Sequence, residues 1–161
     1  MIRHYDFTNK RFLCVDTGVH TGWAIHKNTL FPKTGEINCP RQIKLHEAKA
    51  VYLYEEFSRL LDKYKIDACF IESVQYFEND LVSRTANVRG DLFFLNGIGW
   101  MYWTLCMTRN IERYLILPRE WKGNMNKEIT AERVFLVNGL RYKETHITDA
   151  VAMGFSLMGK L

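Results

Sequence analysis

Short hydrophobic runs alternate along this chain with longer segments of helical periodicity. Runs of apolar residues that end on polar or turn-forming residues are typical of buried strands, and they occur at residues 12–15, 67–71 and 114–117. Residues 22–25 and 30–37 are two further expected strands, close behind the first. Because the connections among these first three strands are short, we expect an antiparallel meander.

Four segments are expected to be helical, at residues 42–65, 81–108, 129–137 and 145–159. In the first, apolar side chains such as Ala50, Tyr54 and Phe57 recur at steps of three and four, as on one face of a helix. The second is expected to be a helix from its length, although three glycines interrupt it. Gly139 suits a helix C-cap, and Thr145 is a candidate N-cap for the last helix.

The order of elements is therefore β-β-β-α-β-α-β-α-α, with a polar loop at residues 119–128. A meander followed by β-α-β units predicts an α/β fold with a mixed five-stranded sheet, in which an antiparallel three-strand meander adjoins two parallel strands and helices cover both faces. The length of 161 residues favours one domain, residues 1–161. In such sheets, functional residues gather where strand ends meet helix ends.

Two of the expected core strands end on a carboxylate, Asp16 and Glu72. If these strands are parallel neighbours, the two carboxylates meet at one edge of the sheet. An ordinary turn also explains Asp16, because Asp-Thr-Gly is a common turn sequence in which Asp accepts backbone hydrogen bonds and Gly adopts positive φ. The second acid weakens that alternative, since a bare charge at the end of a buried strand costs free energy unless it is paired or binds a cation.

The last helix adds His146 and Asp149, which lie three residues apart and therefore on the same face. The apolar run at residues 150–155 is expected to pack this face on the sheet near the first turn. Taken alone, His146 is typical of a surface residue and Asp149 of a first-turn acid that favours the helix dipole. Together with the strand-end acids they favour a site for Mg²⁺ or Mn²⁺, where two ions can serve phosphodiester cleavage.

Charge and cysteine content constrain the possible partners and the cellular compartment, but they do not decide the function. The net charge of +4 permits a polyanionic partner but does not require one. The four cysteines lie far apart with no Cys-x-x-Cys pair, so we expect free thiols, a reducing compartment and no zinc site. Because no apolar run approaches the length of a membrane span and the first residues lack a signal sequence, we expect a cytoplasmic protein without a membrane partner.

At these residues the sequence resembles RuvC-type Holliday junction resolvases of the RNase H-like superfamily, almost from end to end. FLCVDTGVHTGWAI is similar to the family's first strand and turn, ACFIESVQ to its second acidic strand, NVRG to the start of its long central helix, PREWKG to the loop with a catalytic basic residue, and HITDAVAMG to its last acidic helix. The resemblance implies an RNase H-like fold and a homodimer that cuts four-way DNA junctions symmetrically. It implies Asp16, Glu72, His146 and Asp149 as ligands of two Mg²⁺ or Mn²⁺ ions, and Lys122 as the catalytic cation near the scissile phosphate.

The sequence also departs from the family's pattern. Thr17 stands where the family commonly has proline, and His146 where many members have aspartate. The position of the aromatic residue that wedges into the junction matches Gln75, next to two aromatic residues. Candidate DNA contacts are Tyr76, Phe77, Arg84, Arg89, Lys122 and Lys127, although a solvated surface explains the four cations as well.

Several functions stay open at this point. The leading interpretation is a metal-dependent endonuclease that acts on branched DNA in recombination or repair. The alternatives are a non-cleaving nucleic-acid-binding module of the same fold, or an RNase H-like nuclease for flaps, forks or RNA–DNA hybrids; the chain is too short for a sugar-kinase or actin-like ATPase. Trp100, Tyr102 and Trp103 are expected in the core or in a dimer interface around residues 97–103.

Overall fold

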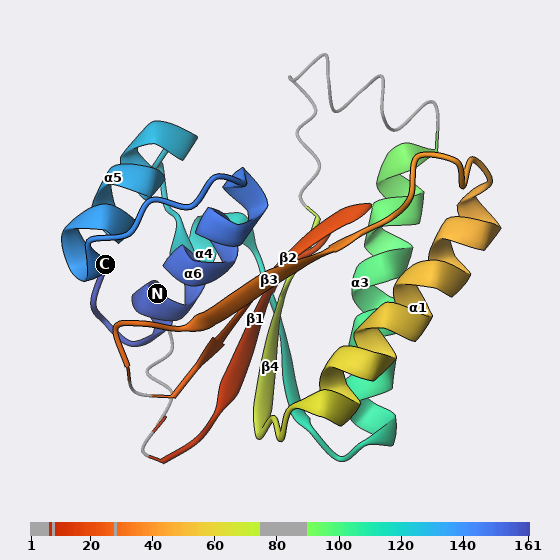
Figure 1. The fold of residues 1–161 in the computed structure, drawn as a ribbon, viewed down its shortest axis with the longest axis horizontal. Coiled ribbons are helices and arrows are strands. Elements are labelled where there is room, and N and C mark those ends of the chain that lie inside the picture. The colour runs from red at the N-terminus through yellow and green to blue at the C-terminus, as the bar shows by residue number, and fades with distance from the viewer. Residues whose placement is uncertain (1–6, 8, 28, 75–89) are drawn as a thin grey trace.

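The sheet of this protein is mixed and has helices on both faces (Figure 1). The computed structural model describes residues 7, 9–27, 29–74 and 90–161. The strands are β1 (Phe12–Asp16), β2 (His20–His26), β3 (Lys33–Asn38), β4 (Ala68–Glu72) and β5 (Glu112–Ile116), in the spatial order β3-β2-β1-β4-β5. The first three strands pair antiparallel, whereas β1–β4 and β4–β5 pair parallel. The predicted meander with two parallel strands is therefore confirmed.

Helices cover the sheet in two groups. They are α1 (His46–Lys63), α3 (Asp91–Thr108), α4 (Pro118–Trp121), α5 (Lys127–Asn138) and α6 (Thr145–Leu157). Figure 1 shows α1 and α3 on one face, and α4, α5 and α6 on the other. The expected long helix is confirmed over α3, and residues 81–89 of that prediction lie outside the described residues.

Two local predictions were wrong. The loop expected at residues 119–128 begins instead with the short helix α4, because Pro118 sits at its first turn and Glu120 accepts a hydrogen bond from the backbone N–H of Leu117 at 2.8 Å. The N-cap of α6 is Glu144 rather than Thr145, which already belongs to the helix. Glu144 has extended backbone geometry and makes no side-chain capping hydrogen bond.

Alternation along β1 divides the core between the two faces of the sheet. Leu13 and Val15 pack into the layer beneath α1 and α3, whereas Phe12 and Cys14 pack into the layer beneath α6. Asp16 follows the same alternation and therefore faces α6. The four cysteines are buried and free, as predicted.

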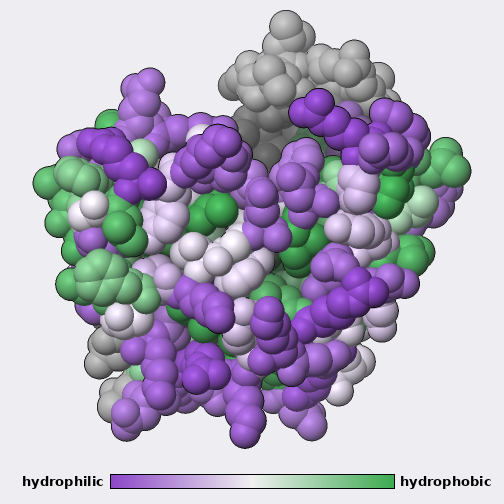
Figure 2. Space-filling view, viewed as in Figure 1, coloured by the Kyte–Doolittle hydropathy of each residue, from purple (hydrophilic) through white to green (hydrophobic). Residues whose placement is uncertain are grey.

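The surface seen in Figure 2 is mostly hydrophilic, with hydrophobic residues at its margins over α1 and α5. Val51 and Tyr54 on α1 and Ile129 and Leu136 on α5 are exposed hydrophobic side chains. Across the described part of the chain, we find no helix with the length and hydropathy that a membrane span requires.

Candidate active site

The two strand-end acids lie side by side. Strands β1 and β4 pair in parallel with Val15 beside Ile71, so the next residue of each strand, Asp16 and Glu72, closes it at the same edge of the sheet. Each lies two residues after a core side chain that faces α6, Cys14 or Phe70, and therefore points to the same face of the sheet. The adjacency expected from the sequence is therefore present, and α6 covers it.

Gly22 allows α6 to approach this edge. It pairs with Asp16 across β1 and β2, and a Cβ atom at Gly22 would lie 2.2 Å from the carbonyl oxygen of His146 and 2.7 Å from the backbone nitrogen of Ile147. Any side chain here would therefore displace the first turn of α6. The glycine places that turn against the sheet, so that Asp149 comes close enough to Asp16 and Glu72 to act on both electrostatically.

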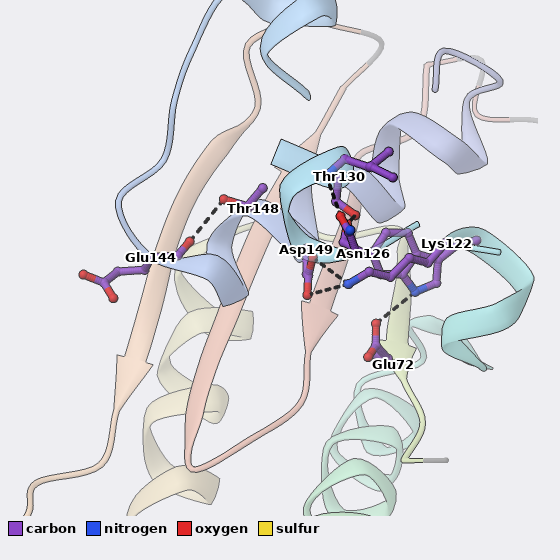
Figure 3. A network of polar contacts seen from close by, with 9 residues as sticks. Glu72, Lys122, Asn126, Thr130, Glu144, Thr148 and Asp149 are labelled. Carbon is purple, nitrogen blue, oxygen red and sulfur yellow. Dashed lines mark hydrogen bonds and ion pairs between the residues drawn. The ribbon is translucent and has the colours of Figure 1, made fainter. Parts of the chain in front are cut away.

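The segment that follows β5 supplies a partner for each of two acids (Figure 3). The Lys122 ammonium lies 3.1 Å from both carboxylate oxygens of Asp149, and their side chains are only 16% and 13% exposed. The indole N–H of Trp121 donates to Glu72 at 2.9 Å. The Ser156 hydroxyl in turn donates to the carbonyl of Trp121 at 2.9 Å, which ties α4 to α6.

The acids repel one another in this cleft. Burial, followed by the charges of Glu72 and Asp149, raises the pKa of Asp16 well above its ordinary value, although Lys122 and Lys127 oppose the shift. Burial and the charge of Asp149 raise the pKa of Glu72 to about 7, against the Trp121 hydrogen bond and Lys122. Clustered acids with raised pKa values are typical of functional sites.

His146 has a different neighbourhood from the three acids. Its Nε2 lies 2.9 Å from Oε2 of Glu36, and its ring stacks on that of His20 with centroids 6.4 Å apart. His20 is exposed and also contacts the side chain of Asn38. Glu36 was not predicted from the sequence, because no pattern near it indicates a site. The strand register of the structure connects it to the acids, since Gly22 pairs with both Asp16 and Glu36.

The donor set suits a hard divalent cation by its chemistry. Asp16, Glu72 and Asp149 offer carboxylate oxygens, which Mg²⁺ and Mn²⁺ prefer, and their mutual repulsion is the kind that a cation relieves. Their present rotamers serve other contacts: Lys122 holds Asp149 and Trp121 holds Glu72. Among the described residues, no three ligating side chains are already grouped to hold a metal in common.

The candidate DNA contacts are divided between described and undescribed segments. Tyr76, Phe77, Arg84 and Arg89, together with Gln75, lie outside the described residues. Lys127 is exposed at the start of α5, and its charge acts on Asp16. Lys122 lies within the acidic cluster itself.

Tyr102 belongs to the core and fixes the turn after β1. It is fully buried, and its hydroxyl lies 3.0 Å from Oγ1 of Thr21, which donates to the carbonyl of Gly18 at 2.6 Å. Trp100, by contrast, is 51% exposed. The aromatic cluster predicted on this helix is thus split between the core and the surface.

Comparison with known proteins finds similarity in structure. No protein-family model and no curated protein matches the sequence. The structure of Thermus thermophilus RuvC in complex with a Holliday junction substrate is similar, with a TM-score of 0.69 and 18% identity over 94% of this chain and 97% of that one. A structure of Thermus thermophilus RuvC gives a TM-score of 0.64 at 16% identity, over 93% of this chain and 97% of that one. The expected likeness is confirmed at the level of the fold: this chain has the RuvC-like form of the RNase H-like fold.

Proposed function

We propose that this protein is a metal-dependent endonuclease that cleaves phosphodiester bonds in branched DNA, most specifically at four-way junctions. The convergence of Asp16, Glu72, Asp149 and Lys122 at the ends of β1 and β4 carries the proposal. The likeness to a structure of RuvC in complex with a Holliday junction substrate supports the choice of a junction among branched DNAs.

In this proposal Asp16, Glu72 and Asp149, with His146 beside them, hold two Mg²⁺ or Mn²⁺ ions. When bound, such ions activate a water molecule and stabilise the leaving oxygen of a phosphodiester. Lys122 then leaves Asp149 and neutralises charge on the scissile phosphate. Trp121 orients Glu72 through its indole N–H, and burial by α6 keeps water from competing for the carboxylates.

The protein also acts as a homodimer in this proposal, because two symmetric cuts in one junction require two active sites. The apolar surface of α3 near residues 97–103 supports this interface, since Trp100 is half exposed there. Phe93, nearer the start of the same helix, is 84% exposed. Light scattering of the free protein and of its junction complex tests the assembly. Monomers in both states contradict it.

A cleavage assay on matched substrates tests the proposed activity. The wild type is expected to cut a four-way junction in Mg²⁺ or Mn²⁺ faster than a flap, a fork, a linear duplex or an RNA–DNA hybrid. Asp16→Asn should abolish cutting and keep junction binding, because the carboxylate holds metal whereas basic residues hold the backbone. Glu55→Gln, a similar loss of charge on the outer face of α1, is the control and should cut at the wild-type rate.

The outcomes separate the competing functions. Binding to junctions without cutting by the wild type favours the non-cleaving module of the same fold. Preferred cutting of flaps, forks or hybrids replaces the junction as the substrate but keeps the active site. An Asp16→Asn protein that cuts at the wild-type rate overturns the assignment of the active site itself.

A further inference from the structure

A groove lies beside the acidic cluster, and most of its lining takes no part in the proposed cleavage. It lies between α4, the loop after it and α5, and its cavity volume is about 570 Å³. In Figure 1 these elements and the C-terminus lie together on one side of the sheet. The groove is lined by Arg119, Lys122, Met125, Ile129 and Arg133, among others.

Some charged side chains around the groove have partners within the described structure, and others form no ion pair there. Lys122 is paired with Asp149, and Glu120, the acid in the lining, already accepts the Leu117 backbone N–H. Arg119 and Arg133 are exposed, and neither forms an ion pair with any described residue. The groove therefore presents two available guanidinium groups.

The lining suits the backbone of one nucleic-acid strand. Guanidinium groups bind phosphate through paired hydrogen bonds, and this contact is stronger than one between neutral groups. Ile129, which is 45% exposed, and Met125 give the groove an apolar surface for a sugar ring. A cavity of this volume is in the range that holds a small ligand, so it accommodates a short stretch of one strand rather than a duplex.

We propose that this groove is a second phosphate-binding subsite, in which Arg119 and Arg133 hold the sugar–phosphate backbone of the strand that is cut. The inference rests on the proposed function. Lys122 connects the two places, because its ammonium contacts Asp149 while the residue also lines the groove. A strand whose phosphate lies at the carboxylates thus passes Lys122 and continues between α4 and α5.

The dependence of junction binding on salt tests the subsite. Each phosphate contact contributes about 0.7 to 0.9 to the slope of log K against log salt concentration. In an Asp16→Asn background, which prevents cutting, the double variant Arg119→Gln/Arg133→Gln should lower the magnitude of that slope by roughly 1.4 to 1.8. Its melting temperature should stay at the parent value, because both side chains are exposed and form no ion pair within the described structure.

Two control variants make the result specific. Arg119→Lys/Arg133→Lys keeps both charges and should keep the slope. Arg59→Gln on α1 removes a cation from the opposite face of the sheet and should leave the slope unchanged. An unchanged slope in the double glutamine variant overturns the subsite, as does an equal loss in Arg59→Gln.

Failure of the subsite and failure of the proposed function are distinguishable. A wild type that binds junctions without cutting them contradicts the nuclease, and the slopes still decide whether the groove holds phosphates. A wild type that cuts junctions while the double glutamine variant keeps the parent slope contradicts the subsite alone. Absence of any DNA binding overturns both.

Discussion

Replacing Glu72 with glutamine should stabilise the metal-free protein, and the gain should depend on pH. Glu72 is ionised at a cost in the folded state, because it is buried and faces Asp149. Glutamine keeps an oxygen that can accept the indole N–H of Trp121, so the substitution removes the charge and little else. We therefore expect the free energy of unfolding in EDTA to rise at neutral and alkaline pH.

The pKa of Glu72 gives the size and the pH range of this effect. Folding raises that pKa from 4.5 to about 7, so the folded state binds the proton more tightly than the unfolded state. Ionisation of Glu72 then destabilises the wild type progressively as pH rises from 4.5 to 7. The cost reaches about 3 kcal/mol at pH 8, as an upper limit, and is below about 1 kcal/mol at pH 5. At pH 8 this corresponds to a rise in melting temperature of roughly 6–12 °C.

Chemical denaturation of Glu72→Gln and wild type at pH 8 and pH 5, in EDTA, measures this difference. Glu55→Gln on the exposed face of α1 is the control, and its stability should change by no more than about 0.5 kcal/mol at either pH. Mg²⁺ or Mn²⁺ should stabilise the wild type by mass action and the variant less. Loss of stability in Glu72→Gln at pH 8, or an equal gain at both pH values, refutes the account of a strained acidic cleft.

Three further outcomes follow from the same structure. Gly22→Ala should lower the free energy of unfolding by about 3 kcal/mol or more, because the new Cβ meets the backbone of α6. Gly97→Ala, whose Cβ meets open space, should raise it by up to about 1 kcal/mol in the same denaturation experiment. Equal effects of the two substitutions contradict the close approach of α6 to Gly22. Burial lowers the pKa of His26 to about 3, so the unfolded state gains its proton first and the wild type loses about 2 kcal/mol of stability between pH 8 and pH 5 from this group alone. His26→Leu should therefore lose about 2 kcal/mol less than the wild type over that range, and parallel pH profiles argue against a neutral buried ring. If Glu36 orients His146 as a ligand, Glu36→Ala should weaken Mn²⁺ binding about 10- to 100-fold in calorimetry. His146→Asp should shift the metal preference toward Mg²⁺. An unchanged Mn²⁺ affinity in both Glu36→Ala and His146→Ala would mean that His146 is only a residue at the start of the helix.

Features that repeat along the chain were predictable from the sequence. Short apolar runs and helical spacing record which residues are buried, so they located the strands and the main helices along the chain. The acids at the ends of two core runs, Asp16 and Glu72, could be brought together by assuming that their strands are parallel neighbours, and the register confirms it. Element ends were less certain, because Pro118 and Glu120 build a short helix from local hydrogen bonds that no apolar pattern records.

The contacts around the acids depend on packing between segments that are distant in sequence. Nothing near Trp121 in the sequence indicates that its indole reaches Glu72, 49 residues away. Likewise His146 and Asp149 share a helix face, yet one contacts Glu36 on β3 and the other Lys122 beyond α4. Helical spacing places two side chains on one face but does not choose their partners, because those partners come from different elements packed around α6.

The difference between what the apolar pattern records and what packing decides also explains why so little sequence identity accompanies the RuvC-like fold. The fold of this chain depends on apolar faces and on a glycine where α6 meets β2, and many sequences satisfy those conditions. The polar partners that set rotamers and pKa values, such as Trp121 for Glu72 and Glu36 for His146, are free to differ once the backbone brings the acids together. We therefore expect metal preference and substrate to depend more on these surrounding partners than on the carboxylates themselves. In this chain, Trp121 and Glu36 are the partners to substitute first.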